Sequence, residues 1–142
     1  CKFFFIASLG EKDIDNSIKC GSPGFVQCET KSKISWTDLD GNRMYRTIGN
    51  IIENGIVSLL FVNFEKIDKV KNKDQISVIR IQGQSNVIFY QNKRPKIVIK
   101  IKEIIPNCPR YIPKMSLQHE SKYLLDDITP EWKTRKYIKN II

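Results

Sequence analysis

The sequence predicts a mainly β fold: a small antiparallel β-barrel of six or seven strands in hairpin order, with one internal helix and a partly helical C-terminal tail. Three observations predict it. Short apolar or alternating runs are separated by turns of glycine, proline and polar residues, as in hairpins. One segment, residues 44–53, has helical spacing instead. The length of 142 residues, 41% of them hydrophobic and 27% charged, is that of one ordinary globular domain.

The first part of the chain supplies four predicted strands. Residues 3–9 are almost all apolar and are followed by glycine, which is typical of a central strand. Residues 17–20 alternate between polar and apolar side chains, so one face of that strand is polar. A Gly-Ser-Pro-Gly turn at residues 21–24 leads to two further short strands, at residues 25–29 and 34–37.

The internal helix is expected to run from Met44 to Glu53. Its apolar face would comprise Met44, Ile48, Ile51 and Ile52. Asn54 and Gly55 follow directly, and an Asn-Gly pair is typical of a helix C-terminal cap.

Three strands are predicted after the helix. Residues 56–64 are apolar almost throughout and are expected to be buried on both faces. Residues 75–90 form a long alternating run in which Gly83 indicates a bulge or a bend. Residues 96–105 alternate cleanly, with lysines on the side opposite the isoleucines.

The remainder of the chain is expected to be irregular with short helices. Residues 106–113 contain three prolines and are predicted to be neither helix nor strand interior. Residues 121–126 are weakly helical, and residues 129–132 look like a helix start with Thr129 as N-cap. We therefore expect a barrel domain at residues 1–113 and a tail at 114–142, packed on the barrel or on a partner subunit. Because the apolar pattern is already present at a first residue that is not Met, a leading segment is expected to be missing.

The charge is unevenly distributed along the chain. The formal net charge is +9, and residues 66–102 hold ten basic and two acidic side chains, a net +8. Such a segment can attract nucleic acid or another anionic partner. Alternatively it is a lysine-rich strand edge that resists pairing with other sheets. The second reading is favoured, and a nucleic-acid partner is not expected. No apolar run approaches the roughly 20 residues of a membrane span, so no membrane partner is expected.

Four cysteines and one histidine are present. They include no C-x-x-C pair, and His119 stands far from the cysteines, so no metal site is expected. Cys20 and Cys28 lie in strand-like runs and are interpreted as small buried apolar residues. This usage indicates a reducing, cytoplasmic location.

One polar stretch has more convergent hydrogen-bond donors than any other. A strand ends at residue 37, the chain turns at Asp-Gly, and the predicted helix begins among polar side chains. Free amides and the positive end of a helix dipole would lie together there, which suits a phosphate. The side-chain donors are Asn42, Arg43, Arg46 and Thr47. Alternatively this is a capped turn in which the two arginines pair with Asp38 and Asp40 and no ligand is needed.

Six motifs, in this order, resemble a known family. They are Phe-Phe-Phe-Ile-Ala-Ser (3–8), Gly-Ser-Pro-Gly-Phe-Val (21–26), Asp-Gly-Asn-Arg-Met-Tyr-Arg-Thr-Ile-Gly-Asn (40–50), Leu-Leu-Phe-Val-Asn-Phe (59–64), Ile-Gln-Gly-Gln-Ser (81–85) and Asn-Cys-Pro-Arg-Tyr-Ile-Pro (107–113). Together they resemble the pyridoxamine 5'-phosphate oxidase-like, FMN-binding split-barrel proteins, in their general flavin-binding subgroup. The residues after Trp132 do not reproduce the Arg-x-x-Pro signature of the vitamin-processing oxidase itself.

The resemblance implies a split barrel, a homodimer, and FMN in a cleft between the subunits. By position it implies that phosphate is held by Asn42, Arg43, Arg46 and Thr47, with Ser17 and Lys19 projecting toward the same pocket. The pair Trp36 and Thr37 would lie along the flavin ring, and Asn50 is a further candidate. The remaining candidates are Asn107, Arg110 and Tyr111, either on a rim that reaches the flavin from the partner subunit or in a proline-stiffened dimer contact.

The expected function is that of an FMN-dependent oxidoreductase. It would pass a hydride or electrons between a nicotinamide or other donor and a small acceptor. The sequence identifies no catalytic residue, since the cofactor would carry the chemistry. The alternatives are a flavin carrier without turnover, and a small basic β-barrel that binds nucleic acid or another anionic partner.

Overall fold

The computed structural model describes residues 2–64, 67–68, 73–74, 77–125, 128 and 130–134. Its elements are β1 (Phe3–Leu9), β2 (Ile14–Cys20), β3 (Gln27–Thr30), β4 (Lys33–Thr37), α1 (Arg46–Glu53), β5 (Ile56–Asn63), β6 (Ile67–Asp68), β7 (Lys73–Asp74), β8 (Ser77–Ile88), β9 (Lys96–Asn107), α2 (Lys122–Leu125) and the 3-10 helix η1 (Glu131–Thr134).

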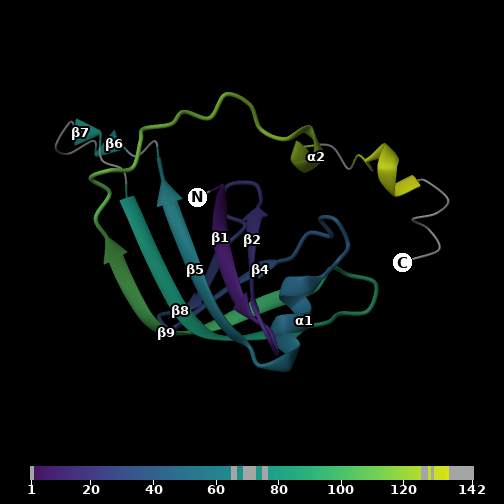
Figure 1. Cartoon of the computed structure of the whole chain (residues 1–142). Coiled ribbons are helices and arrows are strands. Elements are labelled where there is room, and N and C mark those ends of the chain that lie inside the picture. The colour runs from purple at the N-terminus through teal and green to yellow at the C-terminus, as the bar shows by residue number, and fades with distance from the viewer. Residues whose placement is uncertain are drawn as a thin grey trace.

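Seven strands form one antiparallel sheet in the order β2-β1-β5-β8-β9-β4-β3, and β6 and β7 form a separate small hairpin. The sheet curls round on itself, with α1 at one end (Figure 1). Within the described residues the outer strands β2 and β3 each pair with a single neighbour, so the barrel is open between them. The predicted mainly β fold, an antiparallel split barrel with one internal helix, is confirmed.

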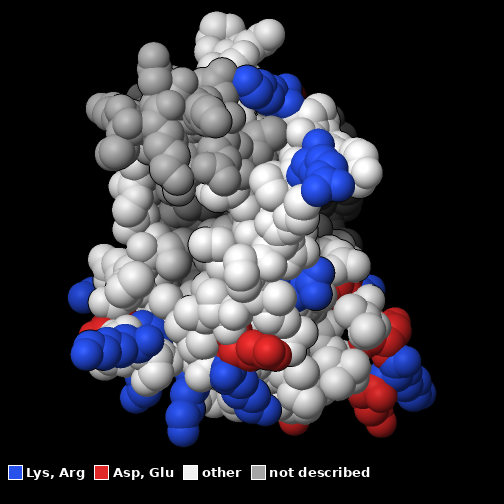
Figure 2. Space-filling view, turned by 90° about the vertical axis from the view of Figure 1, so that its left-hand side faces the viewer, with Lys and Arg blue, Asp and Glu red and all other residues white. Residues whose placement is uncertain are grey.

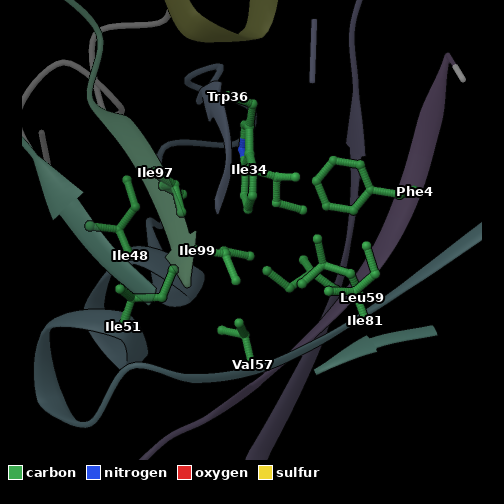
Figure 3. Close-up of a cluster of buried hydrophobic side chains, with 11 residues drawn as sticks. Phe4, Ile34, Trp36, Ile48, Ile51, Val57, Leu59, Ile81, Ile97 and Ile99 are labelled. Atoms are coloured by element: carbon green, nitrogen blue, oxygen red, sulfur yellow. The ribbon is translucent and has the colours of Figure 1, made fainter. Parts of the chain in front are cut away.

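The core fills the inside of the curled sheet (Figure 3). Phe4 and Trp36 are among its largest buried side chains, and their rings pack edge to face at 4.9 Å. Aliphatic side chains from five strands and from α1 surround them, which holds the helix against the barrel. These are Ile6, Ile34, Ile48, Ile51, Val57, Leu59, Ile81, Ile97 and Ile99.

The helix differs from its prediction at the start and agrees at the end. It begins at Arg46, two residues later than expected, because Tyr45 has a left-handed backbone with φ of 52°. Of the four predicted face residues only Ile48 and Ile51 are buried, while Met44, which precedes the helix, and Ile52 are exposed. The C-terminal cap is confirmed: Gly55 has φ of 68°, and its N–H donates to the carbonyl of Asn50 at 3.3 Å.

The predicted irregularity at Gly83 is confirmed as a bulge. The register between β8 and β9 shifts there, so that Gly83 lies opposite Ile101. A Cβ at Gly83 would lie 2.5 Å from the carbonyl oxygen of Lys100, which explains the glycine.

Two strand predictions were wrong. β9 continues through Pro106 to Asn107, beyond its expected end. It pairs with β4 as far as Lys100, and the Ile101 N–H still donates to the carbonyl of Ser32 at 2.8 Å. Pro106 lies beyond this paired stretch, where a proline is tolerated. β5 is not buried on both faces: its residues alternate at first between exposed or half-buried and fully buried positions.

The remaining predictions about the cysteines and the tail have mixed outcomes. Cys28 is exposed and Cys20 half-buried, so the interpretation of Cys28 as a core residue was wrong. The weak helical signal at residues 121–126 is confirmed by α2, while the predicted N-cap Thr129 lies outside the described residues.

None of the described helices has the length and apolar character that a membrane crossing requires.

Candidate functional site

A cavity of about 450 Å³ lies at the open side of the barrel, beside the start of α1. Its walls come from β2, from the end of β4, from the loop that follows β4, and from the first turn of α1. The volume is within the range of roughly 300–1,000 Å³ that small-molecule sites occupy. The lining residues are Asp15, Asn16, Ser17, Ile18, Lys19, Cys20, Trp36, Thr37, Asp38, Leu39, Asp40, Gly41, Asn42, Met44, Tyr45, Arg46, Thr47 and Ile48.

The loop between β4 and α1 has an unusual backbone. Gly41, Arg43 and Tyr45 all have positive φ, of 44°, 60° and 52°. Positive φ in a residue other than glycine is strained and persists only where the surroundings hold it. The loop is held in part by the Met44 N–H, which donates to Asn42 Oδ1 at 3.1 Å.

The start of α1 has no side-chain cap. Tyr45 is the N-cap residue, and its side chain accepts no capping hydrogen bond from the first turn. Arg46, Thr47 and Ile48, which form that turn, all line the cavity. The first amides of a helix lack partners within the helix, and the dipole makes this end positive. The cavity therefore has an anion-attracting end.

A buried carboxylate organises the opposite wall. Asp38 is 4% exposed. It accepts a hydrogen bond from Lys19 Nζ at 3.0 Å and one from Trp36 Nε1 at 3.1 Å. A buried charge needs such partners, because its desolvation otherwise costs several kcal/mol. Lys19 is thereby fixed on β2 with its ammonium at the cavity wall.

The other charged groups of the cavity are paired too. Arg46 forms ion pairs with Asp15 at 3.3 Å and Asp13 at 3.9 Å. Asp40 Oδ2 accepts from Lys133 Nζ at 2.7 Å and from Arg43 Nε at 3.4 Å. The cavity is therefore nearly neutral in charge, and an anion entering it would share these cations with the carboxylates already bound to them.

The structure brings seven of the twelve predicted site residues together at this cavity. They are Ser17, Lys19, Trp36, Thr37, Asn42, Arg46 and Thr47. Among them Trp36 is 2% exposed and belongs mainly to the core.

The other five lie elsewhere. Arg43 turns to Asp40, as in the alternative interpretation of the sequence, and is not part of the cavity wall. Asn50 donates to Ser8 Oγ at 3.0 Å and so ties α1 to β1. Asn107 lines a separate groove on the outer face of the sheet, together with Arg80. Arg110 and Tyr111 are exposed and line neither hollow.

Sequence reasoning missed two features of the site. It assigned Asp38 to the surface as an arginine partner, although Asp38 follows a buried strand directly and is itself buried. It gave no role to Lys133, whose contact with Asp40 spans 93 positions of the chain. No group of His, Cys, Asp and Glu within the described residues could hold a metal ion.

The basic residues do not gather into one patch on the face shown in Figure 2. Lys and Arg side chains appear there as separate spots, with Asp and Glu between several of them. One basic residue of the charged segment, Lys96, is bound to Glu29 at 2.6 Å. Lys66, Lys69 and Lys71 of the charged segment lie outside the described residues.

Comparison with known proteins gives likenesses of fold. No family model and no curated protein matches the chain. A "Putative pyridoxamine 5'-phosphate oxidase" from Corynebacterium glutamicum is 9% identical, with TM-score 0.49 over 73% of this chain and 77% of that one. A second structure of that name, from Listeria innocua, is 8% identical, with TM-score 0.49 over 75% and 88%. A conserved protein of unknown function from Corynebacterium diphtheriae is 8% identical, with TM-score 0.47 over 73% and 82%.

Proposed function

We propose that this chain is an FMN-binding flavoprotein and an oxidoreductase of the pyridoxamine 5'-phosphate oxidase-like type. It would pass a hydride or electrons between a nicotinamide or other donor and a small acceptor. The observation that carries the proposal is the cavity beside α1. It is lined by Lys19, by Arg46 and by a helix start that has no side-chain cap.

The donors of this cavity fit the phosphate of FMN. The first turn of α1 offers amides and the positive end of the helix dipole, and Lys19, Arg46 and Thr47 add side-chain donors. Ile18, Leu39 and Met44 add apolar surface of the kind that a flat ring system requires. FMN, when bound, would supply two-electron redox chemistry, while the protein would hold it, tune it through nearby charge and limit access.

The pairing of the cations sets the expected affinity. A charge-assisted hydrogen bond contributes about 1.5–3 kcal/mol. Because Lys19 and Arg46 already bind carboxylates, each is expected to contribute at the lower end of that range. Together with the helix amides and ring contacts this supports a dissociation constant in the micromolar range, which corresponds to about 8 kcal/mol.

A homodimer with the flavin at the subunit interface is part of the proposal. Its support is an apolar row on the outer face of the sheet, beside the cavity. Ile18 of β2 lies opposite Phe5 of β1, which lies opposite Leu60 of β5. Ile18 and Phe5 are exposed, and Ile18 also lines the cavity. A second copy covering this row would close the open side of the site.

One preparation tests these statements. The purified protein, alone or after FMN is added and the excess removed, should show a flavin absorbance spectrum. Light scattering from the same sample should give a molar mass twice that of the 16.5 kDa chain. Added NADH or NADPH should then bleach the flavin, which a carrier without turnover would not do. A colourless protein that ignores added FMN would contradict the proposal, and a monomer would contradict its dimeric part.

A further inference from the structure

Residues 130–134, called here the C-terminal segment, lie at the wall of the cavity. After β9 the chain crosses over one end of the barrel, and η1 lies near the loop that joins β4 to α1 (Figure 1). The contact is made by Lys133, whose Nζ donates to Asp40 Oδ2 at 2.7 Å. The side chain of Lys133 is 6% exposed.

A buried lysine makes this docking dependent on Asp40. An ammonium removed from water is costly unless a carboxylate compensates it. Lys133 Nζ also lies 5.5 Å from the centre of the Trp132 ring. The backbone N–H of Lys133 donates a hydrogen bond to the carbonyl of Pro130 at 3.0 Å. Asp40 is the carboxylate that completes this arrangement.

Asp40 in turn faces the proposed anion site. Burial would raise the pKa of Asp40, but the hydrogen bond and charge of Lys133, and then those of Arg43, bring it below its ordinary value of 3.8. At neutral pH a carboxylate therefore lines the cavity in which the phosphate is proposed to bind. Without a cation beside it, this carboxylate would repel a phosphate dianion.

We propose that Lys133 is a positioning residue of the cavity. It neutralises Asp40, so that the cavity accepts a dianion, and it couples docking of the C-terminal segment to binding of that anion. The inference rests on the proposed function and names the residue that regulates the same site. Coupling of this kind is reciprocal, so a bound phosphate group also strengthens docking of the segment.

FMN titrations of four variants test the inference. Lys133→Met should weaken FMN binding about tenfold, because Asp40 on the cavity wall then keeps only the longer contact with Arg43, at 3.4 Å, among its described cation partners. Asp40→Asn should bind FMN within about twofold of the natural chain, since it removes the negative charge of Asp40. The double variant Lys133→Met/Asp40→Asn should recover the affinity. Lys122→Met, which removes an exposed lysine from the same part of the chain, should leave it unchanged.

The double variant separates the charge from mere anchoring. If Lys133 only anchored the segment, Asp40→Asn could not rescue its loss, and a double variant as weak as Lys133→Met would overturn the inference. Unchanged affinity in Lys133→Met would overturn it too.

Hydrogen exchange without FMN gives an independent readout. Amides of residues 38–45 should exchange faster in Lys133→Met than in Lys122→Met, because the loop loses the shorter of the two described cation contacts of Asp40. If the natural chain binds no FMN, the proposed function fails. Faster exchange would still support the role of Lys133 at this loop, and unchanged exchange would overturn it.

Discussion

Trp36→Ala is expected to lower the free energy of unfolding by about 3–5 kcal/mol, the range for removing a large buried aromatic side chain. Trp36 is 2% exposed and packs edge to face on Phe4 within the core. The variant would leave a cavity there. It would also remove the indole N–H that binds Asp38 at 3.1 Å. Since a domain of this size has about 5–15 kcal/mol of stability, the loss is a large share of the total.

Urea unfolding measures this loss, and two further variants divide it. Trp36→Phe keeps most of the ring but not the N–H, and should cost about 1–3 kcal/mol. Phe89→Ala, at an exposed aromatic residue, should stay within about 0.5 kcal/mol of the natural chain. A loss below 1 kcal/mol in Trp36→Ala would mean that Trp36 is not packed in the core.

Lys19→Met is expected to cost about 3 kcal/mol, because it leaves a buried carboxylate without its charged partner. Asp38 is 4% exposed, and of its two described side-chain partners it would keep the Trp36 indole N–H. The low end of the usual range for breaking a buried pair applies, since the Lys19 side chain is itself 15% exposed.

A double variant isolates the pair from other effects of the substitution. Lys19→Met/Asp38→Asn should recover to within about 1.5 kcal/mol of the natural chain, because a neutral amide can still accept from the Trp36 indole. Lys100→Met, at an exposed lysine of β9, is the matched control and should have little effect. A double variant as unstable as Lys19→Met would show that the lost stability does not come from the unpaired carboxylate of Asp38.

The strands were predictable because they repeat a simple pattern. Between Lys96 and Ile101 every second residue is isoleucine, and Ile97 and Ile99 are fully buried in the structure. A glycine inside an alternating run likewise indicated the bulge at Gly83, where backbone from the next strand excludes a side chain. Such signals depend on neighbouring residues only, so they can be recognised from the sequence alone.

The start of α1 was predicted less well because it depends on backbone strain. Helical spacing includes Met44, yet the left-handed conformations of Arg43 and Tyr45 delay the helix to Arg46. Neither residue type indicates positive φ. The strain is set by the packing around the loop, which the sequence does not display.

Of the charge pairs of the site, the sequence anticipated only that of Arg43 with Asp40, in the alternative interpretation. The family resemblance implied that Lys19 and Arg46 face one pocket, and both line the cavity. Their partners, however, depend on contacts across the barrel. Lys19 binds Asp38, 19 residues away, and Lys133 binds Asp40, 93 residues away. The sequence suggested carboxylate partners only for the two arginines, whereas in the structure a carboxylate also accompanies Lys19 and Lys133.

Calorimetric titration with FMN and, separately, with riboflavin tests the central claim most directly, since the two ligands differ only in the phosphate. We expect FMN to bind with a micromolar dissociation constant and riboflavin at least tenfold more weakly, because the amides of α1, Lys19 and Arg46 would bind only the phosphate. Equal affinities for the two ligands, or no binding of FMN, would contradict the claim that this cavity is a phosphate site.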